Sequence, residues 1–120
     1  MVKTETLITV KPRRTDWLRA NGIDGLLELI FYKNPDLIRI ARAFLEEVKR
    51  RQRERTPYPA SDWKSYLKQQ GITHSNYFSV VGRLCGAGLL RREKGYYYVT
   101  RDFSTFLSQM EDVWNAWLAI

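Results

Sequence analysis

The sequence predicts a mainly α-helical protein with one small β-hairpin, and three observations support this fold class. Apolar residues recur at helical spacing in several segments. The stretch GLLRREKGYYYVT at 88–100 has the strand alternation and tight glycine turn of a hairpin. Prolines and glycines separate these segments and set their boundaries. At 120 residues the chain is most simply one domain.

The first part of the chain contains one candidate strand and two short helical pieces. LITV at 7–10 is an apolar run of strand length. A first helix is expected from Trp17 until Asn21-Gly22 closes it, and a second over 24–32. These elements would precede the main helical body.

A clear helix follows, with Asn34 as its N-cap and Pro35 at its first helical position. Six apolar residues between Leu37 and Val48 fall on one helical face. The helix continues into the basic run KRRQRER at 49–55, and Thr56-Pro57 breaks it.

Two shorter helices and the hairpin come next. Ser61 or Asp62 can cap a helix that ends at Gly71, and a second helix is expected over 74–87, with Gly88 ending it. The hairpin strands follow, and Gly95 can take the positive φ that their turn requires.

Asp102 caps a long last helix with a wide apolar stripe. An apolar stripe of this width has to be covered by another surface. Two coverings are possible: packing on the helix at 36–55, or pairing with a second copy of the chain. We expect a homodimer, with an interface made by Phe103, Phe106, Leu107, Met110, Val113, Trp114 and Trp117.

The charge is unevenly distributed along the chain. Twenty Lys and Arg against thirteen Asp and Glu give a net charge of +7. Residues 102–120 carry −3, so the first 101 residues carry +10. A basic body favours a polyanionic partner, although solubility or heat adaptation would also explain it.

Several classes of function are not expected. There is no apolar run of membrane-spanning length and no signal-peptide pattern, so we expect a cytoplasmic protein. One Cys and one His cannot form a zinc site without carboxylates, and the sequence has no such cluster, so we expect no metal site. No cofactor is expected either. Asp36 and Glu47-Val48-Lys49 imitate a nuclease signature, but eleven residues of one helix separate the two acids by about 16 Å. We therefore expect no enzyme.

The order helix, tight turn, helix and two-stranded hairpin over 57–101 resembles the winged helix-turn-helix superfamily. ITHSNYFSVVGRLCGAGLL is similar to its second helix, and REKGYYYVT is similar to its wing. On this resemblance, 1–56 form an N-terminal helical extension and 102–120 a C-terminal dimerisation or packing helix. Gly82 and Gly86 depart from the pattern, because each costs a helix interior about 1 kcal/mol relative to Ala.

The resemblance implies sequence-specific binding of double-stranded DNA by a transcriptional regulator. The second helix would lie in the major groove. Its expected contact residues, which include Asn and Arg side chains able to make bidentate base contacts, are His74, Ser75, Asn76, Ser79 and Arg83. Alternatively, Ser75 and Asn76 only cap the helix.

Two further basic groups are candidates for phosphate contacts. Arg91, Arg92 and Lys94 on the wing would grip the DNA backbone, or would merely guard a solvated hairpin edge. Lys49, Arg50, Arg51 and Arg53 could follow phosphates, or could complement the helix dipole.

Two other functions stay open at this point. Winged helices also serve as protein–protein interaction modules in larger replication, transcription or remodelling assemblies, and fold alone does not decide between these roles. Exposed aromatic residues such as Phe78 and Tyr97 would instead favour RNA or single-stranded DNA.

Overall fold

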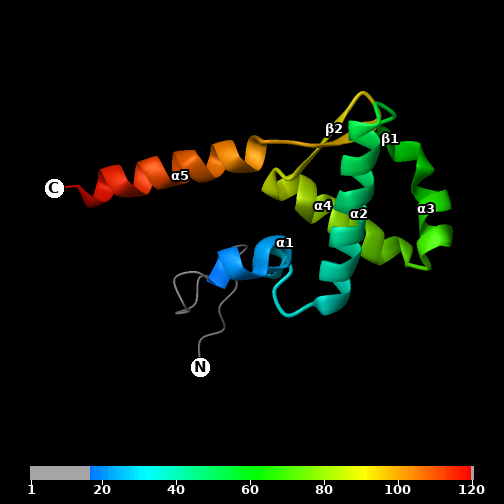
Figure 1. The fold of residues 1–120 in the computed structure, drawn as a ribbon, viewed down its shortest axis with the longest axis horizontal. Coiled ribbons are helices and arrows are strands. Elements are labelled where there is room, and N and C mark those ends of the chain that lie inside the picture. The colour runs from blue at the N-terminus through cyan, green and yellow to red at the C-terminus, as the bar shows by residue number, and fades with distance from the viewer. Residues whose placement is uncertain (1–16, 120) are drawn as a thin grey trace.

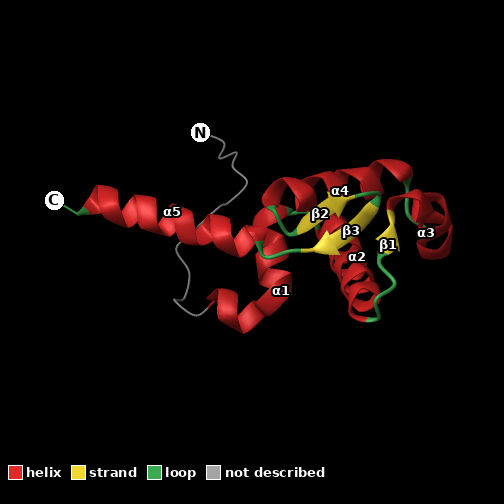
Figure 2. Ribbon diagram, turned by 90° about the horizontal axis from the view of Figure 1, so that it is seen from above, coloured by secondary structure: helices red, strands yellow, loops and turns green. Residues whose placement is uncertain are grey.

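The protein is mainly helical and has a small antiparallel sheet (Figures 1 and 2). The computed structural model describes residues 17–119, so the strand expected at 7–10 lies outside the described residues. In chain order the elements are α1 (Trp17–Ile30), α2 (Pro35–Arg53), β1 (Tyr58–Pro59), a 3-10 turn (Ala60–Asp62), α3 (Trp63–Gln70), α4 (His74–Ala87), β2 (Leu90–Glu93), β3 (Tyr96–Val99) and α5 (Asp102–Leu118).

The helix boundaries follow local capping chemistry. The Asn34 side chain accepts a hydrogen bond from the Leu37 backbone N–H at 3.2 Å and starts α2. Thr73 starts α4 in the same way through the Asn76 N–H. Gly71 and Gly88 end α3 and α4 in the left-handed conformation. These four boundaries confirm the predictions.

Helix α1 consists of two helical pieces, as expected. Gly22 lies between them with φ 60° and ψ −140°, which is not helical geometry. The second piece carries the buried residues Leu27 and Ile30 toward α2. The kink therefore separates an exposed first turn from a part of α1 that belongs to the core.

The sheet has the strand order β1-β3-β2, with all pairs antiparallel. Strands β2 and β3 form the expected hairpin, and Lys94 and Gly95 at its turn have φ of 52° and 84°. Positive φ at both central residues is what a two-residue turn of type I′ requires. Strand β1 was not predicted, because it is only two residues long and one of them is proline.

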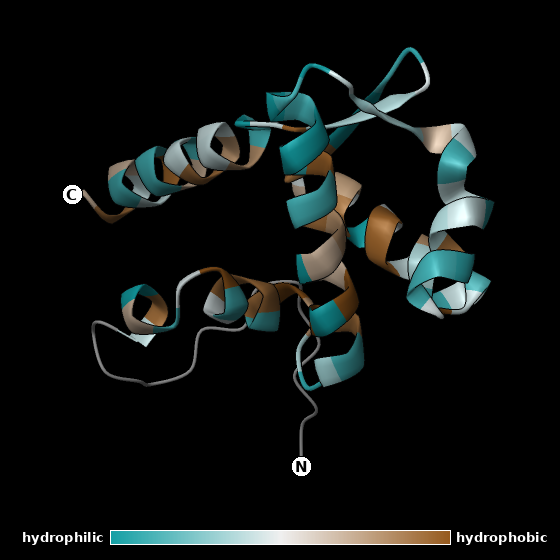
Figure 3. Cartoon of the chain, turned by 45° about the vertical axis from the view of Figure 1, so that its right-hand side comes forward, coloured by the Kyte–Doolittle hydropathy of each residue, from teal (hydrophilic) through white to brown (hydrophobic). Residues whose placement is uncertain are grey.

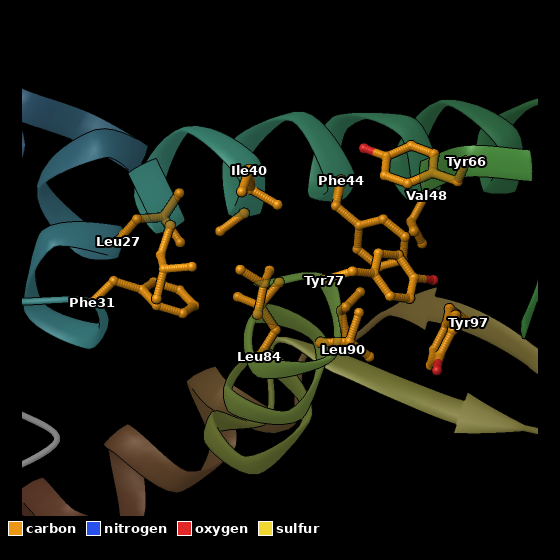
Figure 4. Packing of buried hydrophobic residues seen from close by; sticks show 14 of the residues in the cluster. Leu27, Phe31, Ile40, Phe44, Val48, Tyr66, Tyr77, Leu84, Leu90 and Tyr97 are labelled. Carbon is orange, nitrogen blue, oxygen red and sulfur yellow. The ribbon is translucent and has the colours of Figure 1, made fainter. Parts of the chain in front are cut away.

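One hydrophobic core joins α1, α2, α3, α4 and the sheet (Figure 4). Its centre is Phe44, whose ring meets four tyrosine rings edge-on at centroid distances of 5.2–5.8 Å. These are Tyr58, Tyr66, Tyr77 and Tyr97. Edge-to-face contacts suit the quadrupoles of aromatic rings, so the cluster holds α2 against both α4 and the sheet.

Helix α5 does not pack on α2, which overturns one of the two expected coverings of its stripe. None of its side chains is buried, and it projects away from the rest of the molecule (Figures 1 and 3). Its first turn is attached by the Phe103 N–H, which donates to the Gly88 carbonyl at 3.0 Å. No helix among residues 17–119 is long and apolar enough to cross a membrane.

Candidate nucleic-acid interface

Helices α3 and α4 follow each other with a three-residue connection over 71–73. Gly71 and Ile72 both donate their N–H groups to the Leu67 carbonyl, which closes α3 tightly. Trp63 of α3 then contacts His74 and Phe78 of α4, at ring distances of 5.1 and 5.5 Å. The turn and the aromatic contacts together fix how α4 is presented.

The solvent-facing side of α4 carries only small side chains along its centre. Tyr77, Val80, Val81 and Leu84 are buried on the inner side. At 100° of rotation per residue, the residues opposite them are Ser75, Ser79, Gly82 and Gly86. A Cβ added at either glycine would meet no atom of residues 17–119 within 4 Å. Another molecule can therefore approach the backbone of α4 closely.

The five residues expected to contact DNA do not share one face of α4. Ser75 and Ser79 lie on the central outer line, whereas His74 and Arg83 are nine residues apart and lie on opposite flanks. Both flanking side chains are exposed, and Asn76 is half-buried on the same flank as Arg83, about two helical turns before it. The ring of Trp63 on α3 lies 5.1 Å from the His74 ring, so the His74 flank is partly occupied by α3.

Arg83 is the most available cation on α4. Its guanidinium lies 5.5 Å from the ring centre of the buried Phe31, a cation–π distance. Arg83 forms no ion pair with a described residue. The ion pairs in that part of the chain are formed by other arginines. The contact with Phe31 orients the charge without neutralising it.

The two arginines of the hairpin lie on opposite faces of the sheet. Arg91 lies near the carboxylates of Glu93 and Asp102, at 3.4 and 3.9 Å. Arg92 pairs across the sheet with the buried Tyr97 and lines a groove with Cys85 of α4. Burial raises the pKa of the Cys85 thiol, and the charge of Arg92 opposes that shift. Arg91 lines the same groove, but Arg92 is the hairpin arginine whose charge acts on Cys85 of α4.

Lys94 occupies the tip of the hairpin. It is exposed, and no described carboxylate lies within ion-pair distance of its ammonium group. Because its φ is 52°, the position is one that Asn or Gly would occupy with less strain. A cation is present here even though the turn geometry favours other residues.

Half of the basic run on α2 is already paired within the protein. Arg50 binds Glu47 and Glu54 at 2.7 and 2.9 Å, and Arg51 binds Glu47 and stacks 4.8 Å from the Tyr58 ring. Partial burial works to raise the pKa of Glu47, but hydrogen bonds from both arginines lower it below its ordinary value. These two arginines stabilise the fold.

The remaining two predicted phosphate contacts on α2 are free of such pairs. Lys49 and Arg53 are exposed, and neither forms an ion pair with a described residue. Gln52 between them has a structural role that sequence reasoning missed. Its side chain accepts from the Val99 N–H at 2.8 Å and donates to the Val99 carbonyl, which fixes the end of β3 to α2.

The aromatic residues divide differently from the expectation. Phe78 is 40% exposed, but Tyr97 is 5% exposed and belongs to the core, so it cannot stack on a base. Tyr96, on the other face of β3, is the exposed ring instead. Strand alternation predicts opposite faces for neighbouring tyrosines but does not say which face is buried.

The nuclease-like residues do not converge. Asp36 and Glu47 both lie on α2, near its first turn and past its middle. Within residues 17–119 there is no group of three His, Cys, Asp or Glu side chains placed to hold a metal ion. The arrangement on α2 therefore gives no support to metal-dependent cleavage.

The chain belongs to an archaeal protein family, whose model matches residues 21–120. The match begins within α1 and includes α3, α4, the hairpin and α5. No curated protein and no solved structure matches the chain.

Proposed function

We propose that this protein is a winged helix-turn-helix protein that binds double-stranded DNA. The observation that carries the proposal is the short turn between α3 and α4, followed directly by a hairpin that lies beside α4. This is the order in which a recognition helix and a wing contact a duplex. The positive net charge of the first 101 residues supports a polyanionic ligand.

In this proposal α4 enters the major groove with its line of small residues foremost. The serine hydroxyls of Ser75 and Ser79 can bond to bases or phosphates. Gly82 lets the helix backbone approach a sugar–phosphate strand without a side chain between them. Arg83 on one flank reaches base edges, and it is the α4 residue suited to reading guanine.

The hairpin and α2 supply contacts that depend little on sequence. Arg92 beside α4 and Lys94 at the hairpin tip would meet phosphates, as would Lys49 and Arg53 where the duplex passes α2. Such contacts release counterions, so they add affinity and make it depend on salt. Sequence-specific binding of this kind suits a transcriptional regulator, which is the role that we propose.

The test is fluorescence anisotropy with a labelled random duplex and with sequences selected from a random pool. We expect binding that weakens steeply with salt, with a log–log slope of about −4 because each phosphate contact contributes roughly 0.9. Arg83→Ala should weaken selected duplexes by about 1–3 kcal/mol and random ones less.

Lys94→Asn is a matched probe of the wing. It removes the charge and leaves Asn-Gly, a preferred type I′ turn, so the hairpin should be at least as stable. All duplexes should weaken alike, and the salt slope should fall by about 1. Absence of duplex binding at low salt would reject the proposal and favour an interaction module for an acidic protein. Preference for single strands would favour the RNA or single-stranded DNA alternative.

A further inference from the structure

Helix α5 presents a long apolar stripe to solvent. Seven large apolar side chains of this helix are exposed, with Met110 at 53% and Trp117 at 73%. The rings of Trp114 and Trp117 stack at 5.4 Å on this surface (Figure 3 shows the helix). At roughly 150–250 Å² for a large side chain, the exposed stripe is on the order of 800 Å². One partner in a standard protein interface buries about this area.

The stripe is symmetric about Met110. Phe106 lies four residues before Met110 and Trp114 four after it, and Leu107 and Val113 lie three on either side. Phe103 and Trp117 complete the pattern at seven residues. An antiparallel copy of the same helix, centred on Met110, therefore places an apolar residue opposite each of these seven positions, and only Leu118 of the exposed large apolar residues would face a polar one, Asp102. That self-complementarity is what a twofold interface requires.

The charges are compatible with the same alignment. Glu111 lies at the edge of the stripe, across from Gln109 of the second copy, and Asp112 lies on the side of α5 away from the stripe, about 160° from Met110, so no two carboxylates are directly opposed. A shift of one residue would set Met110 opposite Glu111 and Phe106 opposite Asn115, and larger shifts keep only part of the apolar match. The pattern therefore favours one register as well as one orientation.

The end of the stripe continues into the body of the protein. Phe106 and Gln109 line both the stripe and a groove of about 450 Å³ beside the C-terminal end of α4. Gly86 forms part of that groove and leaves it open. In the antiparallel alignment the far end of the second copy's α5, which carries Trp117, reaches this region.

We propose that two copies of this chain pair through α5, antiparallel, on a twofold axis at Met110. The second copy covers the stripe that nothing in the described part of one chain covers. This inference goes beyond the proposed function, because the pairing does not depend on what α4 binds.

The first experiment measures the oligomeric state without DNA by sedimentation velocity. The wild type should sediment as a dimer. Met110→Glu places two carboxylates face to face on the axis, and the dimer dissociation constant should rise at least about 100-fold. Ser108→Glu is the matched control, since it adds the same charge on the opposite side of α5 and should leave the dimer intact. Neither change touches a buried residue, so folding is not at stake.

The second experiment tests orientation by disulfide formation in a Cys85→Ser background. Met110→Cys should cross-link with itself. Phe106→Cys should not, because the antiparallel alignment separates the two copies of residue 106 by about 12 Å. Mixed with Trp114→Cys, however, Phe106→Cys should cross-link. A monomer at all concentrations, equal effects of both glutamate variants, or self-cross-linking of Phe106→Cys would overturn the proposal.

Discussion

At the scale of single residues, contacts between segments far apart in sequence explain features that local patterns do not. Gln52 looks like one member of a basic run, yet its amide forms two hydrogen bonds with the backbone of Val99. Arg51 pairs with Glu47 and covers the Tyr58 ring instead of facing a ligand. The run therefore contains both structural residues and free cations.

Replacing Gln52 by Ala should lower the free energy of unfolding by about 1–3 kcal/mol, because it leaves half-buried backbone groups of Val99 without partners. Urea denaturation measures the change. Arg53→Ala, at the exposed next position, is the control and should stay within about 0.5 kcal/mol of the wild type. Equal effects of the two variants would show that the Gln52 bridge contributes nothing.

At the scale of elements, α4 shows a conflict between helix stability and surface shape. Gly82 lies in the interior of α4, where glycine is unfavourable, and a Cβ there would touch nothing in the described part of the chain. The packing of one copy gives no reason for it. A close approach by DNA is a reason, and the proposed function supplies it.

Gly82→Ala should therefore raise the free energy of unfolding by about 0.5–1 kcal/mol and weaken duplex binding at the same time. Urea denaturation and anisotropy on one sample measure both effects. Gly71→Ala is the contrasting variant, since its φ of 65° disfavours alanine even though space is open. It should destabilise the protein. A stabilised Gly82→Ala variant with undiminished binding would contradict close approach at α4.

The sequence was sufficient for the elements whose signals are local. Asn34, Thr73 and the two helix-ending glycines act through their own neighbours, so capping rules located α2, α3 and α4. Strand β1 could not be found, because its two residues become a strand only by pairing with Tyr96 and Tyr97.

The candidate site was predictable only in part. Residue types indicated which helix would be presented, but the outer line of α4 depends on which side is buried. Arg50 and Arg91 form ion pairs with carboxylates of the protein itself. Residue types alone did not show that these carboxylates would compete with a ligand for the two arginine charges. Likewise the sequence showed the apolar stripe on α5. It did not show that no element of the described chain covers this stripe.

At the scale of the whole molecule, the tyrosine-rich core makes the free energy of unfolding sensitive to pH in the alkaline range. Burial raises the pKa of Tyr58, Tyr77 and Tyr97 above the ordinary 10.0, and it raises the pKa of Tyr66 to about 12. The folded protein therefore keeps these phenols neutral at a pH where the unfolded chain ionises them.

The free energy of unfolding should consequently be insensitive to these groups below about pH 9 and should fall as the pH rises from about 10 to 12. The sign follows because the unfolded state then binds fewer protons than the native state. Urea midpoints across this range measure the decline. Tyr66→Phe should make the decline shallower, and an unchanged slope would show that this phenol is not held neutral.

The proposed function depends on a cationic surface formed by α4 and the hairpin that fits a double helix. The most direct measurement is the affinity of wild type and Lys94→Asn for one duplex across a salt series. The account predicts strong salt dependence for the wild type and a slope smaller by about 1 for the variant. Identical slopes, or no duplex binding at low salt, would contradict it.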